Sequence, residues 1–149
     1  MAKMIFLTVG SLKNKACLAL QEEYLGRIRH YTSCELIEAR DATQKIPESE
    51  NLLKKIGSGD FVVLLDEKGK TVSSTGLAQQ IQKWNGQGLK RVVWIVGGAF
   101  GVAEEIKKKA NLVLSLSSLT LPHELARVVF FEQIYRAFTI LKGEKYHHE

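Results

Sequence analysis

The feature that most limits how this chain can fold is the alternation of short apolar runs with amphipathic stretches. Five largely apolar runs lie at positions 4–9, 34–39, 61–65, 92–96 and 112–116, and the run at 61–65 consists of β-branched, aromatic and leucine residues. Runs of this length without a polar face predict strands that are buried on both sides. Such strands alternating with helices are typical of an α/β fold, with a mostly parallel sheet covered by helices on both faces.

The stretches between the runs predict helices at residues 14–31, 48–56, 73–85, 103–110 and 123–142. In the first of these, Ala16, Leu20, Tyr24 and Ile28 follow at four-residue steps and form one apolar face. Residues 40–48, with Pro47, are expected to form a loop, and residues 66–70 a turn. The 149 residues contain no repeat, low-complexity tract or linker, so a single domain over residues 1–149 is expected.

Cysteine content, the length of the apolar runs and net charge indicate which classes of protein the chain can belong to. The two cysteines show no C-x-x-C spacing, which favours reduced thiols in a cytoplasmic protein over a disulfide framework. No run approaches the roughly 18 apolar residues of a membrane span, and residues 4–9 are too short for a signal-peptide core. The net charge of +5 mildly favours an anionic partner such as RNA.

Three strand ends carry unusual chemistry, at Leu65-Asp66, residues 97–101 and residues 116–121. Ligands of open α/β sheets bind beyond the carboxyl ends of the strands. Gly97 and Gly98 let the backbone approach a ligand, although a sharp turn without a ligand is the simpler explanation of a lone Gly-Gly pair. Residues 97–101 do not form the G-x-G-x-x-G pattern, which disfavours a nicotinamide site.

Residues 116–121 combine the hydroxyls of Ser117, Ser118 and Thr120 with three leucines. An apolar slot with exposed backbone groups suits a flat heterocycle such as adenine. Turns made by the hydroxyls at the start of the last helix are the alternative for this loop alone. Three such loops at one sheet edge together make a ligand site as plausible as three unrelated turns.

The last helix is apolar on more than one face, so it is either enclosed within the fold or covered by a second subunit. We expect a homodimer. No ligand spacing joins His123 to His147 and His148, so no metal site is expected. A tail with Tyr146 and two histidines is unusual for a purely solvating end, because tyrosine can stack on a base and histidine exchanges protons near neutral pH.

Several motifs resemble one known family, the RlmH-type rRNA methyltransferases of the SPOUT superfamily, over essentially the whole chain. They are IFLTVGSLK at 5–13, LDEKGK at 65–70, VGGAFG at 96–101, LSLSSLTLPH at 114–123, Arg127, EQIYRAF at 132–138 and Tyr146-His147. The family methylates N3 of a pseudouridine in 23S rRNA. The family commonly has Arg or Lys after the Tyr-His pair, where this chain has His148.

The resemblance implies a site for S-adenosylmethionine at Leu65, Gly97, Leu116, Ser117, Ser118, Leu119, Thr120 and Leu121. It also implies a SPOUT-type fold with a C-terminal trefoil knot, and a homodimer that places the tail of one subunit near the donor pocket of the other. Tyr146 and His147 are then the expected catalytic residues. His123, Arg127, Arg136 and His148 are the expected contacts to rRNA, although salt bridges are an equal explanation for the two arginines.

Two alternatives remain open at this point. One is a non-catalytic module with the same fold that binds RNA or the ribosome. The other is a SPOUT methyltransferase that acts on another rRNA position or on tRNA.

Overall fold

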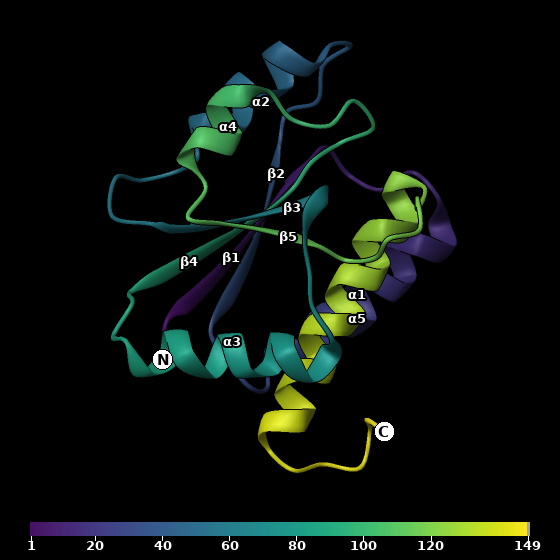
Figure 1. Ribbon diagram of the computed structural model, residues 1–149. Helices are drawn as coiled ribbons and strands as arrows, with labels where there is room; N and C mark the ends of the chain where they lie inside the picture. Colours follow the sequence, from purple (N-terminus) through teal and green to yellow (C-terminus); the bar gives the residue numbers. More distant parts are fainter. Residues whose placement is uncertain (149) are drawn as a thin grey trace.

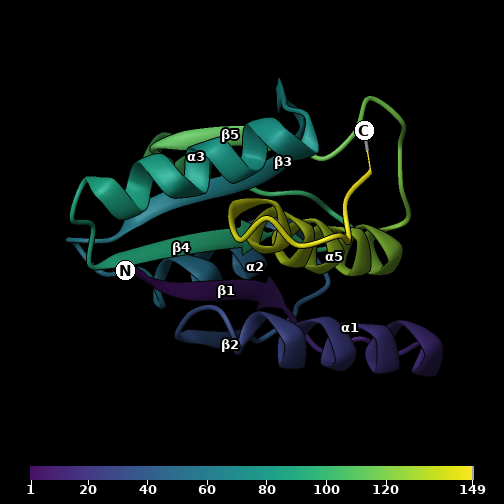
Figure 2. The same cartoon turned by 90° about the horizontal axis from the view of Figure 1, so that it is seen from below.

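The computed structural model describes residues 1–148 and shows five parallel strands with five helices (Figure 1). The strands are β1 (Lys3–Val9), β2 (Cys34–Ala39), β3 (Phe61–Thr71), β4 (Arg91–Val96) and β5 (Leu112–Ser115). The helices are α1 (Lys15–Ile28), α2 (Lys45–Leu53), α3 (Ser74–Gly86), α4 (Glu104–Lys109) and α5 (His123–Leu141). The strand order in the sheet is β2-β1-β4-β3-β5, with every pairing parallel, which confirms the predicted α/β class (Figure 2).

Successive side chains of a strand point to opposite faces of the sheet, so alternate residues of each strand belong to two separate cores. On one face, Phe6 of β1 and Trp94 of β4 pack with α1, α3 and α5. On the other face, Ile5 and Leu7 pack with residues of α2 and α4. The helices therefore cover both faces of the sheet, as the uninterrupted apolar runs predicted.

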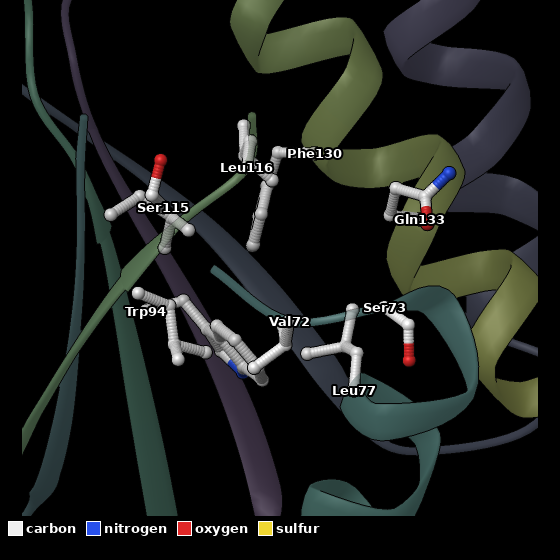
Figure 3. Close-up of a pocket in the computed structure, with 10 residues that line it drawn as sticks. Val72, Ser73, Leu77, Trp94, Ser115, Leu116, Phe130 and Gln133 are labelled. Atoms are coloured by element: carbon white, nitrogen blue, oxygen red, sulfur yellow. The ribbon is translucent and has the colours of Figure 1, made fainter. Parts of the chain in front are cut away.

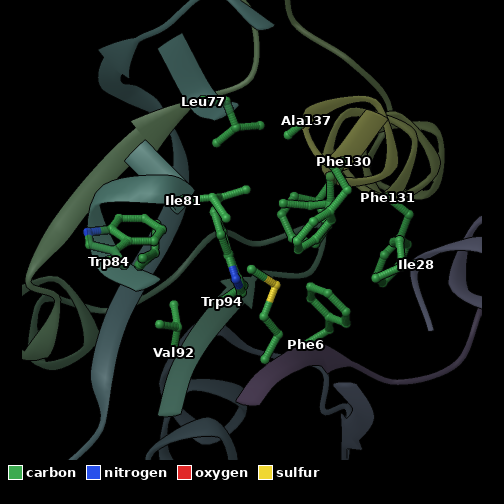
Figure 4. Packing of buried hydrophobic residues seen from close by; sticks show 14 of the residues in the cluster. Phe6, Ile28, Leu77, Ile81, Trp84, Val92, Trp94, Phe130, Phe131 and Ala137 are labelled. Carbon is green, nitrogen blue, oxygen red and sulfur yellow. The ribbon is translucent and has the colours of Figure 1, made fainter. Parts of the chain in front are cut away.

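The larger core is built around aromatic rings (Figure 4). The Phe6 ring meets Phe130 and Phe131 of α5 with ring centroids 5.7 and 5.2 Å apart, both edge-to-face. Trp94 lies 5.6 Å from Phe130. Edge-to-face rings at these distances add stabilisation beyond the area that they bury.

Helix α5 is enclosed between α1 and α3, above the sheet. Its buried residues include Val128, Phe130, Ile134 and Phe138. Enclosure within the fold therefore accounts for much of its broad apolar surface. Leu125 is nevertheless 44% exposed, and cover by a second subunit stays a prediction.

Two local predictions were wrong. Helix α2 begins at Lys45 rather than at Glu48, because Pro47 lies in the first helical turn, where its missing N–H would have no partner in any case. Residues 66–70 were predicted as a turn, but β3 continues to Thr71. The register shifts between Leu65 and Lys70, and both residues are aligned with Leu114 of β5.

The continuation of β3 lies unusually close to β5. A Cβ built on Gly69 would be 2.8 to 2.9 Å from backbone atoms of Val113 and Leu114. Real Cβ atoms are not found so near a neighbouring backbone. Only glycine therefore allows residues 66–71 to pass β5 at this distance.

Candidate functional site

The three strand ends singled out from the sequence meet at one edge of the sheet. They line an open cleft of about 490 Å³, within the range of small-molecule sites. Its lining includes Leu65 and Asp66, residues 97–101, and Leu116, Ser117, Leu119, Thr120 and Leu121. Ser118 is exposed and is not part of the lining. The sheet thus brings together seven of the eight residues expected to bind the donor.

The loop after β4 is shaped by its two glycines. A Cβ on Gly97 would lie 3.0 Å from Val102, and one on Gly98 would lie 3.1 Å from Oε1 of Glu48. The Glu48 side chain is buried and its Oε2 accepts a hydrogen bond from the Ala42 backbone at 3.0 Å. The next residue of α2, Ser49, accepts a hydrogen bond from the Ala103 backbone at 2.8 Å. Glu48 and Ser49 of α2 therefore support the loop on one side. Residues 97–101 of the loop line the cleft.

The loop after β5 satisfies its own hydroxyl groups. Ser115 donates to the carbonyl of Ser117 at 2.8 Å, and the Ser117 hydroxyl accepts from the Leu119 backbone at 2.9 Å. The turn alternative raised by the sequence is thus part of how this loop is built. It leaves the Leu119 side chain 73% exposed at the cleft.

A small, partly open pocket of about 30 Å³ adjoins the cleft (Figure 3). Leu65, Ser115 and Leu116 line both spaces. The rest of the lining is mostly apolar and includes Trp94, whose buried indole N–H has no partner among the described residues. The pocket has room for one water molecule and gives the cleft an apolar inner wall.

The predicted rRNA contacts on α5 lie in different surroundings. His123 is exposed and lines the cleft. Arg127 is buried, and its guanidinium donates to the carbonyls of Val9 and Gly10 at 2.7 and 3.0 Å. Its Nη1 also lies 3.6 Å from the carboxylate of Glu38. Burial lowers the pKa of Arg127 despite this carboxylate. Arg127 therefore joins α5 to the end of β1 in the interior.

The tail folds back against α5. Arg136 pairs with Glu132 through Nη2 at 2.7 Å, and its Nη1 donates to Nδ1 of His147 at 3.1 Å. The Tyr146 hydroxyl donates to the same Glu132 at 3.1 Å, and the Arg136 guanidinium lies 4.7 Å from the Tyr146 ring centroid. Burial, together with Tyr24 and Glu132, raises the pKa of Tyr146 well above its usual value, so this hydroxyl stays protonated at neutral pH.

The cleft lies at the start of α5, where His123 and Ala126 line it, whereas the tail cluster packs on the middle of the helix, at Glu132 and Arg136. The structure thus brings Tyr146, His147 and Arg136 together, while His148 is exposed beside them. Within one chain, none of these four residues lines the donor cleft.

Sequence reasoning did not single out several residues that line or support the cleft. They are Lys45, Glu48, Lys68 and Lys107. Lys68 lies inside the LDEKGK motif quoted above, so that motif held the available signal for it, whereas Phe100 belongs to the strand end at residues 97–101 that was singled out. Lys45 and Glu48 stand in a stretch expected to be a loop, and only the tertiary structure brings them to the cleft.

Over residues 1–148, no group of three or more His, Cys, Asp or Glu is placed to hold a metal ion. None of the helices described there is both long enough and apolar enough to cross a membrane.

Known proteins are similar to this chain over nearly its whole length. Residues 2–147 match the family model described as "Predicted SPOUT methyltransferase". Relatives named "Ribosomal RNA large subunit methyltransferase H" include one from Geobacter sp. (strain M21), 44% identical over 99% of both chains. Another is from Christiangramia forsetii, 42% identical over 94% of this chain and 95% of the relative.

A solved structure shares the fold. It is titled "The structure of a probable methylase family protein from Haemophilus influenzae Rd KW20". Its TM-score is 0.54 with 14% sequence identity, over 99% of this chain and 70% of that chain. At this identity, the match indicates a common fold and nothing further.

Proposed function

This chain belongs to the SPOUT methyltransferase family, and from that premise we propose that it methylates N3 of a pseudouridine in the 23S rRNA of the large ribosomal subunit. The methyl donor is S-adenosylmethionine. The cleft at the sheet edge is the observation that carries the assignment of the donor site. Its volume of about 490 Å³, its glycine loop and its leucine walls suit a nucleoside held by main-chain groups.

The residues of the cleft would bind and orient the donor. Leu65, Leu116 and the neighbouring leucines supply the apolar walls for adenine, and the backbone at Gly97 can approach the ligand because a side chain there would meet Val102. When bound, S-adenosylmethionine supplies a methyl group on a positively charged sulfur. Alignment of donor and acceptor alone can contribute up to roughly 7–11 kcal/mol in favourable cases.

The acceptor nitrogen must lose its proton during the reaction. We assign contact with the target base to the partner subunit's Tyr146 and the partner subunit's His147. An imidazole at the base can accept the N3 proton or stabilise the developing negative charge. The absence of Tyr146 and His147 from the cleft lining of their own chain supports this arrangement, because their packing against Glu132 and Arg136 holds them outside it.

The proposed homodimer supplies the second tail that this arrangement needs. A two-fold axis that sets two α5 helices antiparallel would bring the tail of each subunit toward the cleft of the other. Ribosomes are the proposed substrate and the cytoplasm is the proposed location. The exposed His123 at the cleft and His148 at the tail are assigned to rRNA, whereas the burial of Arg127 favours an internal role for that residue.

We also assign the C-terminal trefoil knot to this fold. The connection from β3 to α3 passes against β5, while the chain after β5 returns to the centre of the molecule as α5. A knot results if α5 passes inside that connection. The tight passage at Gly69 and the enclosed position of α5 support this threading.

Transfer of labelled methyl from S-adenosylmethionine tests the function. We expect label on 23S rRNA when ribosomes from a strain lacking the modification are supplied. Large subunits, naked rRNA and tRNA are assayed in parallel, and mass mapping locates the methyl group. Label on tRNA or on another rRNA position would instead support a different SPOUT specificity. Binding of S-adenosylmethionine by calorimetry without transfer to any acceptor would contradict the assignment, and absence of both would favour a non-catalytic module.

Mixing two inactive variants tests the shared site. His147→Ala removes the tail imidazole, and Gly98→Val pushes a branched side chain against Glu48 and Val9. We expect each variant alone to lose methyl transfer, and an equimolar mixture to regain about a quarter of wild-type activity through heterodimers with one complete site. Circular dichroism checks that both variants fold. Unchanged single-turnover transfer by His147→Ala would exclude a chemical role for this residue, and no recovery on mixing would place each tail at its own cleft.

A further inference from the structure

The rim of the donor cleft carries three lysines and an exposed aromatic ring, together with the acidic residues Asp66 and Glu67. Lys45 is the first residue of α2, Lys68 lies in the irregular part of β3, and Lys107 lies in α4. Phe100 lies in the loop after β4 and lines the same cleft. We call these four residues the basic rim. The sequence separates them by up to 62 positions, and only the fold gathers them around one opening.

The ammonium groups of the basic rim have few internal partners. The ion pairs recorded among residues 1–148 include neither Lys45 nor Lys68. Lys107 lies 3.7 Å from Glu104, a largely exposed carboxylate, and such surface pairs contribute little. The nearby Asp66 carboxylate accepts from the Lys68 backbone at 2.9 Å. The three lysines are therefore able to contact an external anion.

Phe100 is held at the tip of a closed turn. The Gly101 backbone donates to the Gly98 carbonyl at 3.1 Å, which leaves Ala99 and Phe100 as the two tip residues. Behind the turn, Val102 and Ala103 are buried, and Ser49 fixes the Ala103 backbone. The Phe100 side chain is nevertheless 47% exposed. A rigidly held, half-exposed ring offers a stacking surface at low entropic cost.

We propose that the basic rim binds the unpaired rRNA strand next to the target nucleotide, with a neighbouring base stacked on Phe100 and phosphates bound by the three lysines. Aromatic stacking combined with cationic groups that follow the backbone is how proteins bind single-stranded nucleic acid. Cations placed around an aromatic ring favour this occupant over an apolar peptide or a second copy of the chain. The inference rests on the proposed function, because it concerns the acceptor of that reaction.

Steady-state kinetics of the full-length protein on unmodified ribosomes test the basic rim. Phe100→Ala is compared with Phe100→Tyr, which keeps the stacking surface. Lys45→Gln, Lys68→Gln and Lys107→Gln are compared with Lys54→Gln, which replaces the exposed lysine that follows the last residue of α2 and lies outside the cleft lining. Calorimetry with S-adenosylmethionine and sedimentation of each variant report on the donor site and on the oligomeric state.

We expect Phe100→Ala to raise the KM for ribosomes by roughly 5- to 150-fold, the usual effect of losing one stacked base, with kcat nearly unchanged. Phe100→Tyr should behave like the wild type. Each lysine variant should raise KM. It should also reduce the slope of log KM against log salt by about 1, because one phosphate contact is lost. Lys54→Gln should change neither.

Three results would overturn the proposal. They are an unchanged KM for Phe100→Ala and the lysine variants, a loss of S-adenosylmethionine affinity that accounts for the whole effect, and a change of oligomeric state in Phe100→Ala. Failure of the proposed function gives a different result, because the wild-type protein itself would then transfer no methyl group to ribosomes.

Discussion

Replacing Gly69 with alanine is expected to destabilise the native fold by more than about 3 kcal/mol, because the new methyl group would meet backbone that cannot move aside. The Cβ would lie 2.8 to 2.9 Å from Val113 and Leu114, and all of these contacts are with main-chain atoms. Leu114 is buried, and its strand pairs with β3 on the Leu65 side, so a shift of β5 would disturb the sheet. Urea denaturation followed by circular dichroism measures the effect.

Gly86→Ala is the matched control for Gly69→Ala. Gly86 ends α3, and a Cβ there would have no heavy atom within 4 Å. Because alanine favours helix over glycine, we expect this control to be neutral or to add up to about 1 kcal/mol. If Gly69→Ala unfolds at the same urea concentration as the wild type, the close passage of β3 and β5 is not a fixed feature of the fold.

The second large effect is expected from Arg127→Met. The side chain keeps its apolar stem but loses the donors that serve the carbonyls of Val9 and Gly10, and Glu38 loses its partner. Glu38 is exposed, so most of the cost comes from the two carbonyls left without their charged donor, at about 1–3 kcal/mol for each unpaired group. We expect a loss of this size in the free energy of unfolding, measured by urea denaturation.

Arg40→Met serves as the control for Arg127→Met. Arg40 is exposed, so its replacement should change the free energy of unfolding by no more than about 0.5 kcal/mol. The alternative role of Arg127, a contact with an rRNA phosphate, predicts the opposite pattern. In that case, Arg127→Met would retain wild-type stability and lose affinity for ribosomes.

The order of elements and the place of the donor cleft could be predicted because both depend on simple patterns. Runs such as residues 92–96, with no polar face, require a sheet covered on both sides. Once the strands are parallel, their carboxyl ends share one edge, so the loops at Leu65, Gly97 and Leu116 must lie near one another. The structure confirms the fold class and shows this convergence.

Other features depend on contacts that a single sequence does not reveal. The segment Asp66-Glu67-Lys68-Gly69-Lys70 has the composition of a turn, but pairing with β5 keeps it within the strand. In the sequence, Arg127 has the appearance of a surface arginine on a helix. It is buried because its guanidinium donates to carbonyls at the end of β1, among them that of Gly10, 117 positions earlier. Two further features depend on tertiary contacts in the same way. They are the packing of Tyr146 against Glu132 and the position of Lys45 at the cleft.

The enclosed position of α5 has a consequence for how the protein is made. The chain is synthesised from its N-terminus, so every strand has been translated before α5 exists. Until then, Phe6 and Trp94 lack the phenylalanine rings that cover them. A truncated product of a messenger cut before the codons of α5 would therefore present an uncovered apolar sheet face, which is a target for chaperones and proteases. Maturation of this protein accordingly waits for the translation of α5.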